Sequence, residues 1–316
     1  MEESMPHIDP ETVLAYQMPK GKYNYTERDV VLYALGVGAC KDNACDLSEL
    51  DYVYSEDGQH AVKVLPTFGI LFSFNLVERL LTIPGMNFHP SMLLHGEQYI
   101  EIYKKLPTSG EVVYESRISQ LHDKEKAAVL EVETLCRESG SEELLCLNRS
   151  TVFLRGAGGF SKSKTELFSY DKRSPSLRPL VKLPILPPKS VAALTHEDQT
   201  QPNQALLYRL SGDYNPLHSD PEIARIAGFP RPILHGLCTL GYAVRAIIKH
   251  FCHGDPALVQ SIQGRFMLHV FPGETLVTQM WRQEDNVERI NFLCSVKERS
   301  RPVLSGVVFL NASPRL

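Results

Sequence analysis

The stretch HGLCTLGYAVRAIIKHF, residues 235–251, carries apolar residues at every third or fourth position. That spacing predicts a helix with one buried face, formed by Leu237, Leu240, Gly241, Val244, Ile247, Ile248 and Phe251. The segments after it, such as RINFLCSVKE and PVLSGVVFL, are strand-like and separated by turn residues. We therefore expect this half of the chain to form one buried helix followed by antiparallel strands.

The first half of the chain repeats this order of elements. PTFGILFSFNLVERLL, residues 66–81, is apolar almost all round, which predicts a helix buried on most sides. Strand patterns follow it, and YALGVGA, starting at Tyr33, aligns with YRLSGDY, starting at Tyr208. A helix followed by antiparallel strands, repeated twice, predicts an α+β double hot-dog, in which each half is a curved antiparallel sheet wrapped around a central helix.

The length of 316 residues fits two ordinary domains or one double unit. Residues 157–192 are rich in Pro, Ser and Lys and show no sustained period, which predicts a linker. We therefore expect a first repeat over 1–156 and a second over 193–316.

The composition narrows the class of protein. A hydrophobic fraction of 43% and a charged fraction of 22% are typical of a globular chain, and a net charge of −4 argues against a nucleic-acid partner. No apolar run approaches the roughly 20 residues that a membrane span needs. The acidic start, MEESMPHIDPET, resembles neither a signal nor a transit peptide. The seven cysteines are scattered without a CxxC pair, so we expect free thiols.

The loop in YRLSGDYNPLHSD, residues 208–220, brings an acid and a histidine between two helix ends. The second helix is predicted from Asp220 as N-cap, Pro221 at the first position and Gly228 at the end. Because Asn215 and Pro216 turn the chain, the side chains before and after them can converge.

A carboxylate and an imidazole that converge can hold one water and transfer protons. Asp213 and His218 are the candidates for this role. One alternative is a structural Asx-turn with a surface histidine. Another is a metal site, which we do not expect because no second His or Cys stands at ligand spacing.

The start of the second central helix, in PILHGLCTLGY, offers a further binding feature. Gly236 has no Cβ, so a ligand carbonyl could approach the unpaired amides of the helix N-terminus, which carry partial positive charge. Such donors stabilise the enolate of a thioester. The alternative is that Gly236 only permits close packing.

The segment YRLSGDYNPLHSDPEIARIAGFPRPILHGLCT, residues 208–239, resembles the hydratase 2 signature of MaoC-type (R)-specific 2-enoyl-CoA hydratases. YALGVGA, LPTFG, LLHGEQYIEIYKKLP, LRGAGGF and GETLVTQMW extend the resemblance from about residue 20 to residue 312. It implies a double hot-dog with the catalytic segment in the second half only. In the first half, Gly38 and Asn43 align with the dyad and can do no acid/base chemistry. The resemblance also implies room for a long acyl tail there.

The resemblance implies reversible hydration of trans-2-enoyl-CoA to (3R)-3-hydroxyacyl-CoA in fatty acid β-oxidation, with no cofactor and no metal, since CoA is part of the substrate. Asp213 and His218 would be catalytic; which of them deprotonates the water is left open, with Asp213 favoured. Lys124 would meet the CoA phosphates, and Glu56 lies near an acidic family position. The implied substrate contacts are His95, Gly96, Lys124, Tyr214, Asn215, Pro216, Leu217, Gly236 and Phe266.

The C-terminal Ser313-Pro314-Arg315-Leu316 is similar to the S-K-L address read by the peroxisomal import receptor. We therefore expect a peroxisomal protein, and by analogy a homodimer. Two alternatives remain, an acyl-CoA thioesterase of the same fold and a non-catalytic acyl-CoA carrier. Thioesterases generally place their acid or base on the central helix, whereas the candidates here precede it, and the dyad argues against a carrier.

Overall fold

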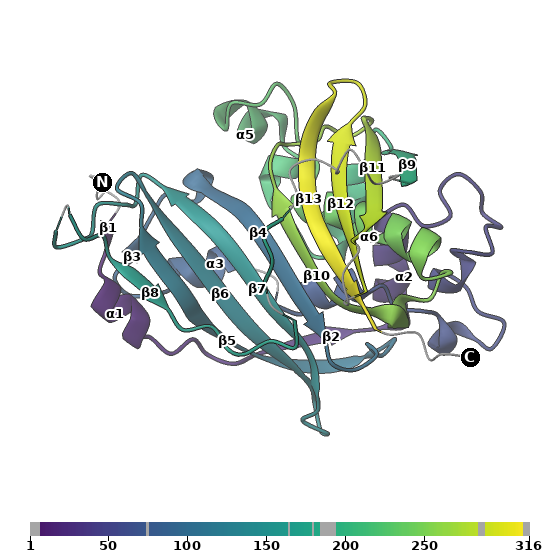
Figure 1. Ribbon diagram of the computed structural model, residues 1–316, viewed down its shortest axis with the longest axis horizontal. Coiled ribbons are helices and arrows are strands. Elements are labelled where there is room, and N and C mark those ends of the chain that lie inside the picture. The colour runs from purple at the N-terminus through teal and green to yellow at the C-terminus, as the bar shows by residue number, and fades with distance from the viewer. Residues whose placement is uncertain are drawn as a thin grey trace.

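The computed structural model describes residues 7–73, 76–163, 165–178, 180–183, 194–283 and 288–311. One antiparallel 11-stranded sheet runs through both halves in the order β2-β5-β6-β7-β4-β10-β13-β12-β11-β9, with β8 paired to β5 (Figure 1). The predicted double hot-dog is confirmed. Its strands are β2 (Gly21–Tyr25), β4 (Leu93–Ile102), β5 (Gly110–Asp123), β6 (Ala127–Glu138), β7 (Leu144–Arg155), β8 (Ser169–Asp171), β9 (Leu194–Gln199), β10 (Val259–Phe266), β11 (Thr275–Arg282), β12 (Arg289–Val296) and β13 (Arg301–Leu310).

The two halves meet where β4 pairs with β10, with Glu97 opposite Arg265 and Glu101 opposite Ser261. A separate small sheet joins β1 (His7–Ile8) to β3 (Met86–Asn87). The two repeats are therefore one double unit held by backbone hydrogen bonds rather than two independent domains.

The predicted central helix of the second half is confirmed as α6 (Gly236–Phe251), which lies against β10 to β13 (Figure 1). Every residue from Leu237 to Ile248 is buried, and not only the apolar stripe. The first half covers the other side: a Cβ added at Gly241 would lie 2.4 Å from Val37 Cγ1. The helix is therefore enclosed by both repeats.

The prediction of a long central helix over residues 66–81 is wrong. The chain forms the 3₁₀ helix η3 (Pro66–Ser73) and the short α-helix α3 (Leu76–Leu81), and Phe74 lies outside the described residues. The segment contains weak helix formers such as Gly69. Tertiary contacts then decide its course, because Asn148 Nδ2 of β7 donates to the Gly69 carbonyl at 2.9 Å. Phe68 packs on Tyr25 of β2 with ring centroids 5.2 Å apart.

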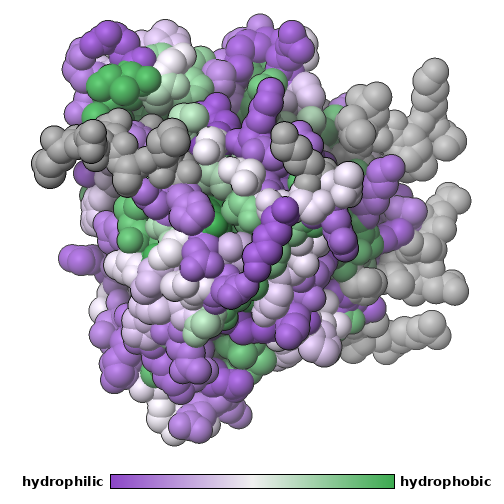
Figure 2. Space-filling view, turned by 90° about the vertical axis from the view of Figure 1, so that its left-hand side faces the viewer, coloured by the Kyte–Doolittle hydropathy of each residue, from purple (hydrophilic) through white to green (hydrophobic). Residues whose placement is uncertain are grey.

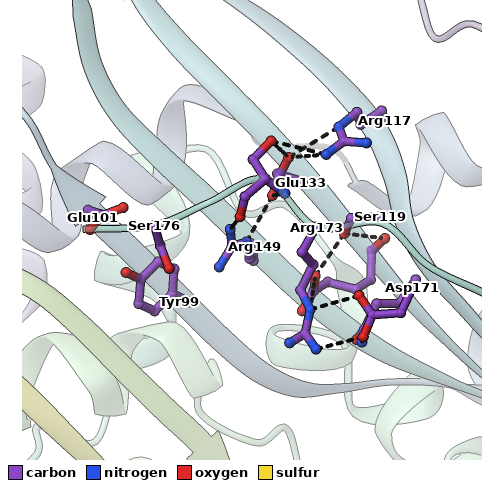
Figure 3. Close-up of polar contacts among 12 residues, drawn as sticks. Tyr99, Glu101, Arg117, Ser119, Glu133, Arg149, Asp171, Arg173 and Ser176 are labelled. Carbon is purple, nitrogen blue, oxygen red and sulfur yellow. Dashed lines mark hydrogen bonds and ion pairs between the residues drawn. The ribbon is translucent and has the colours of Figure 1, made fainter. Parts of the chain in front are cut away.

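The described part of the linker lies across the outer face of the sheet, where β8 pairs with β5. Buried carboxylates bind its backbone: Ser174 N donates to Glu133 Oε2 at 3.0 Å, and Arg178 N donates to Glu101 Oε1 at 3.2 Å. Glu133 also pairs with Arg149 at 2.9 Å (Figure 3). These bonds fix the linker on the first half, and it then reaches β10 of the second half, where Val181 N donates to Gln263 Oε1 at 3.1 Å.

The remaining α-helices are short: α1 (Pro10–Ala15), α2 (Glu27–Gly36), α4 (Gln204–Tyr208) and α5 (Pro221–Ile226). The predicted ends of α5 are confirmed, since Asp220 caps Glu222 N and Ile223 N and Gly228 has a φ of 88°. Across the pseudo-repeat, α2 packs against α4.

The surface beside α1 and β5 mixes hydrophilic side chains with small apolar areas (Figure 2). Within the described part of the chain, no helix is long and apolar enough to cross a membrane. All seven cysteines are free, and five of them are buried.

Candidate active site

The loop between α4 and α5 is held by its own polar residues. After α4 the chain continues as the 3₁₀ turn η5 (Arg209–Ser211), and Gly212 ends it with a φ of 115°. Asn215 N donates to Asp213 Oδ1 at 3.2 Å, and Leu217 N donates to Asn215 Oδ1 at 3.0 Å, which starts the turn η6 (Pro216–His218). The Asx-turn expected as an alternative is therefore present, and it is what orients the two candidate catalytic side chains.

Asp213 and His218 meet at one place, where His235 joins them: one ligand atom of each lies within 4.8 Å of the others. His218 Nδ1–H donates to the Ile233 carbonyl at 2.8 Å, so in the neutral ring Nε2 carries no proton and can accept one. The Asp213 side chain is 17% exposed. The pair is therefore mostly buried but still open to solvent.

The electrostatics of the pair favour proton exchange. Burial raises the pKa of Asp213 above its ordinary value, although the nearby His218 opposes this. Burial lowers the pKa of His218, and Asp213 opposes that change. The two proton affinities move toward each other, so moving a proton between the two groups, directly or through a water, costs less than in free solution.

Three of the expected substrate contacts lie together at the start of α6. A Cβ added at Gly236 would lie 3.0 Å from Phe266 Cδ1 of β10, and the Phe266 ring lies 4.9 Å from the ring of His95 on β4. Burial lowers the pKa of His95 to about 4, so it is neutral. Gly236 thus permits close packing, and it also opens the helix N-terminus beside the dyad.

The other expected contacts are more dispersed. A Cβ at Gly96 would lie 2.4 Å from Phe153, in a bulge of β4, so this glycine has a packing role. Lys124 is exposed in the turn between β5 and β6. It lies at the end of the sheet where β4 begins. Its strand, β5, is four strand spacings from β10, so Lys124 and the Phe266 end of the site are separated by about 19 Å across the sheet. Exposed side chains also include Glu56, Tyr214, Asn215 and Pro216, and Leu217 is partly exposed.

Comparisons with known proteins identify the family of this chain. Residues 23–156 match the model of the MFE-2 hydratase 2 N-terminal domain, and residues 187–299 match that of the MaoC like domain. The chain is 53% identical to the Arabidopsis thaliana protein named enoyl-CoA hydratase 2, peroxisomal, over 98% of this chain and 97% of that protein. The chain belongs to the enoyl-CoA hydratase 2 family.

Other similar proteins share less sequence identity with this chain. Peroxisomal multifunctional enzyme type 2 of Mus musculus is 39% identical over 93% of this chain, which spans 37% of that enzyme. A MaoC-like dehydratase from Phytophthora capsici superposes with a TM-score of 0.78 at 32% identity, covering 97% of this chain and all of the other. A Mycobacterium tuberculosis protein described as a double hotdog shares the fold alone, at 12% identity and a TM-score of 0.59.

In this hydratase 2 family member, sequence reasoning missed one residue of the site. His235 precedes Gly236 in PILHGLCT, and from the sequence the pair indicates only the start of a helix. Its position as N-cap of α6, directly before the candidate oxyanion donor, was the available signal. His235 also supplies the second histidine whose absence we used against a metal site. Asp213, His218 and His235 could hold a metal ion; that the protein needs none stays a prediction.

Proposed function

We propose that this protein hydrates trans-2-enoyl-CoA thioesters reversibly to (3R)-3-hydroxyacyl-CoA, in the β-oxidation of fatty acids in the peroxisome. The observation that carries the proposal is the meeting of the Asp213 carboxylate and the His218 imidazole beside the N-terminus of α6. The 53% identity to a peroxisomal enoyl-CoA hydratase 2 over nearly the whole chain supports the substrate class.

In the proposed reaction one water lies between Asp213 and His218 Nε2. One O–H bond of this water breaks and its oxygen bonds to Cβ of the substrate. The proton passes to the dyad and is delivered to Cα on the same face, while the C=C π electrons form the new Cα–H bond through a thioester enolate. Because the proton returned is the one removed, the dyad ends each turnover in its starting state.

The Gly236 N–H is proposed to donate to the thioester oxygen as negative charge develops there. Amides of a helix N-terminus have no partner within the helix and point outward along its axis. A fixed donor of this kind stabilises the enolate more than the ground-state carbonyl and so lowers the barrier. His95 and Phe266, which pack beside Gly236, would border the bound thioester.

Three further parts of the proposal rest on the family resemblance. Lys124 would bind the CoA phosphates. The 3₁₀ segment η3 would leave the acyl tail more room in the first half than a full helix would. The protein would work as a homodimer without a cofactor. Import would use the C-terminal Pro-Arg-Leu, which lies outside the described residues. Peroxisomal import of a reporter ending in residues 307–316, and its loss without Leu316, would test the last point.

The deciding assay follows purified protein with trans-2-decenoyl-CoA. We expect loss of the enoyl absorbance, no release of free thiol, and a product of R configuration. Free thiol would indicate a thioesterase instead, and tight binding without turnover would indicate a carrier. An S product would contradict the proposed stereochemistry even if hydration occurred.

A further inference from the structure

His235 lies directly against the candidate catalytic histidine. The ring centroids of His235 and His218 are 3.7 Å apart and the planes are tilted by 32°, so the two imidazoles are stacked. His235 is only 1% exposed and is the N-cap of α6, one residue before Gly236. One face of His218 is therefore covered by the residue that begins the central helix.

The hydrogen bonds of His235 fix its tautomer. Its Nε2 lies 3.3 Å from the Asp213 carbonyl oxygen, which can only accept, so Nε2 carries the proton. Its Nδ1 is buried and has no partner among the described residues. The ring also contacts Tyr208, with centroids 4.8 Å apart. His235 thus contacts both members of the dyad: it reaches His218 through its ring and Asp213 through the backbone carbonyl, and its Nε2 also lies 3.8 Å from Asp213 Oδ2.

We propose that His235 is a positioning residue for the hydration reaction, which stacks on His218 to hold its imidazole in place and donates Nε2–H to the Asp213 carbonyl to fix the carboxylate-bearing loop. The inference rests on the proposed function. It gives the histidine before Gly236 a role distinct from substrate binding, because the residue acts through the side chain of His218 and the backbone of Asp213.

The charge of His235 matters for this role. Among the described residues, two titratable groups face His218, Asp213 on its own loop and His235 at the start of α6. Arg209 on η5 acts on Asp213 and on His235, and Tyr208 on α4 packs against the His235 ring. A protonated His235 would place a like charge 3.7 Å from His218 and oppose the proton that His218 has to accept. Burial lowers the pKa of His235 well below its ordinary value, so the ring stays neutral.

Three substitutions separate the two contacts. His235→Phe keeps a ring over His218 but loses the donor, His235→Asn keeps a donor but loses the ring, and His235→Ala loses both. We expect kcat to fall about fivefold in His235→Phe, which loses the hydrogen bond alone, and about a hundredfold in His235→Ala. KM for crotonyl-CoA should stay unchanged in both. Kinetics are measured between pH 4.5 and 8.

The pH profile provides the readout that a merely structural role would not move. Because burial is what lowers the pKa of His218, uncovering its ring in His235→Ala should raise that pKa and move the acid limb of kcat to higher pH. In His235→Phe the ring stays covered and the limb should stay in place. If the acid limbs of His235→Ala and His235→Phe lie at the same pH, the proposal is overturned. It is also overturned if KM changes in proportion to the fall in kcat.

A matched control is His269→Phe, since the His269 ring also packs against aromatic rings, 4.9 Å from Phe229 and 4.8 Å from Phe271. We expect wild-type kinetics there. If His235→Ala does not fold, the Phe and Asn variants carry the test. If wild-type protein does not hydrate enoyl-CoA, the proposed function fails; if it does and the His235 variants behave like His269→Phe, the positioning role fails.

Discussion

The loops after α2 and after α4 occupy corresponding places in the two repeats, but their charged side chains have different roles. The loop after α4 presents Asp213 and His218 to the start of α6. In the loop after α2, Gly38 and Asn43 stand at the aligned positions, and two carboxylates reach α6. Glu49 forms a buried ion pair with Arg245, and Asp46 pairs with Lys249 at 2.7 Å. One repeat thus keeps a candidate reactive pair and the other a structural one.

The difference lies in how fully each carboxylate is satisfied. Glu49 is 3% exposed and binds Arg245, Lys249 at 3.7 Å and the Cys40 N–H at 2.9 Å. Asp213 accepts one backbone hydrogen bond, from Asn215 N, and keeps some exposure. The donors around Glu49 tie it into the packing of α6, whereas burial with few donors raises the pKa of Asp213 and leaves its carboxylate able to take up a proton.

The largest effect should come from removing the candidate reactive pair, Asp213 and His218. Asp213→Asn or His218→Gln should each lower kcat by about 10²–10⁴-fold, with an unchanged melting temperature. Steady-state hydration of trans-2-decenoyl-CoA measures the effect. Asn43→Ala is the control from the other repeat and should keep full activity. Near-normal turnover in either dyad variant would reject the assignment.

The second test removes the structural pair. Glu49→Gln leaves Arg245 buried without a full partner, although Asp198 still binds it at 2.5 Å. The free energy of unfolding should fall by about 3–5 kcal/mol, measured by urea denaturation, while kcat of the folded protein changes less than about twofold. Glu222→Gln breaks the exposed pair with Arg225 and should cost at most about 1 kcal/mol. Equal losses would contradict a structural role for Glu49.

The third test uses pH. The lowered pKa of His218 places the acid limb of kcat/KM below pH 6.5, with activity falling about tenfold per unit below that pKa. Since the Asp213 carboxylate raises the pKa of His218, Asp213→Asn should move the limb of the residual activity to still lower pH. A limb that does not move would mean that the two groups are not coupled.

The smallest expected effect is at the edge of the site. Lys124→Ala should raise KM for acyl-CoA about two- to fivefold, the size of one exposed ion pair, with kcat unchanged. The difference should shrink at high salt because the contact is screened. Lys20→Ala, in the exposed pair with Glu115, is the control. If Lys124→Ala lowered kcat instead, its role would not be phosphate binding.

Much of the candidate site followed from the sequence alone because its signals are local. The period of 3–4 residues predicted α6, and Asp220, Pro221 and Gly228 predicted α5 to the residue. The turn at Asn215 and Pro216 was enough to expect that Asp213 and His218 converge, since both stand within one short loop. Local backbone preferences and side-chain spacing carry this information without any distant partner.

Tertiary structure decided the rest. Residues 66–81 follow a helical pattern by themselves, but the bond from Asn148 to Gly69 and the packing of Phe68 make the first turns 3₁₀. The role of His235 depends on a loop many residues earlier in the chain, and Arg245 finds Glu49 only when the repeats pack together. Contacts between distant segments form by burial and close packing, whose outcome no local pattern specifies.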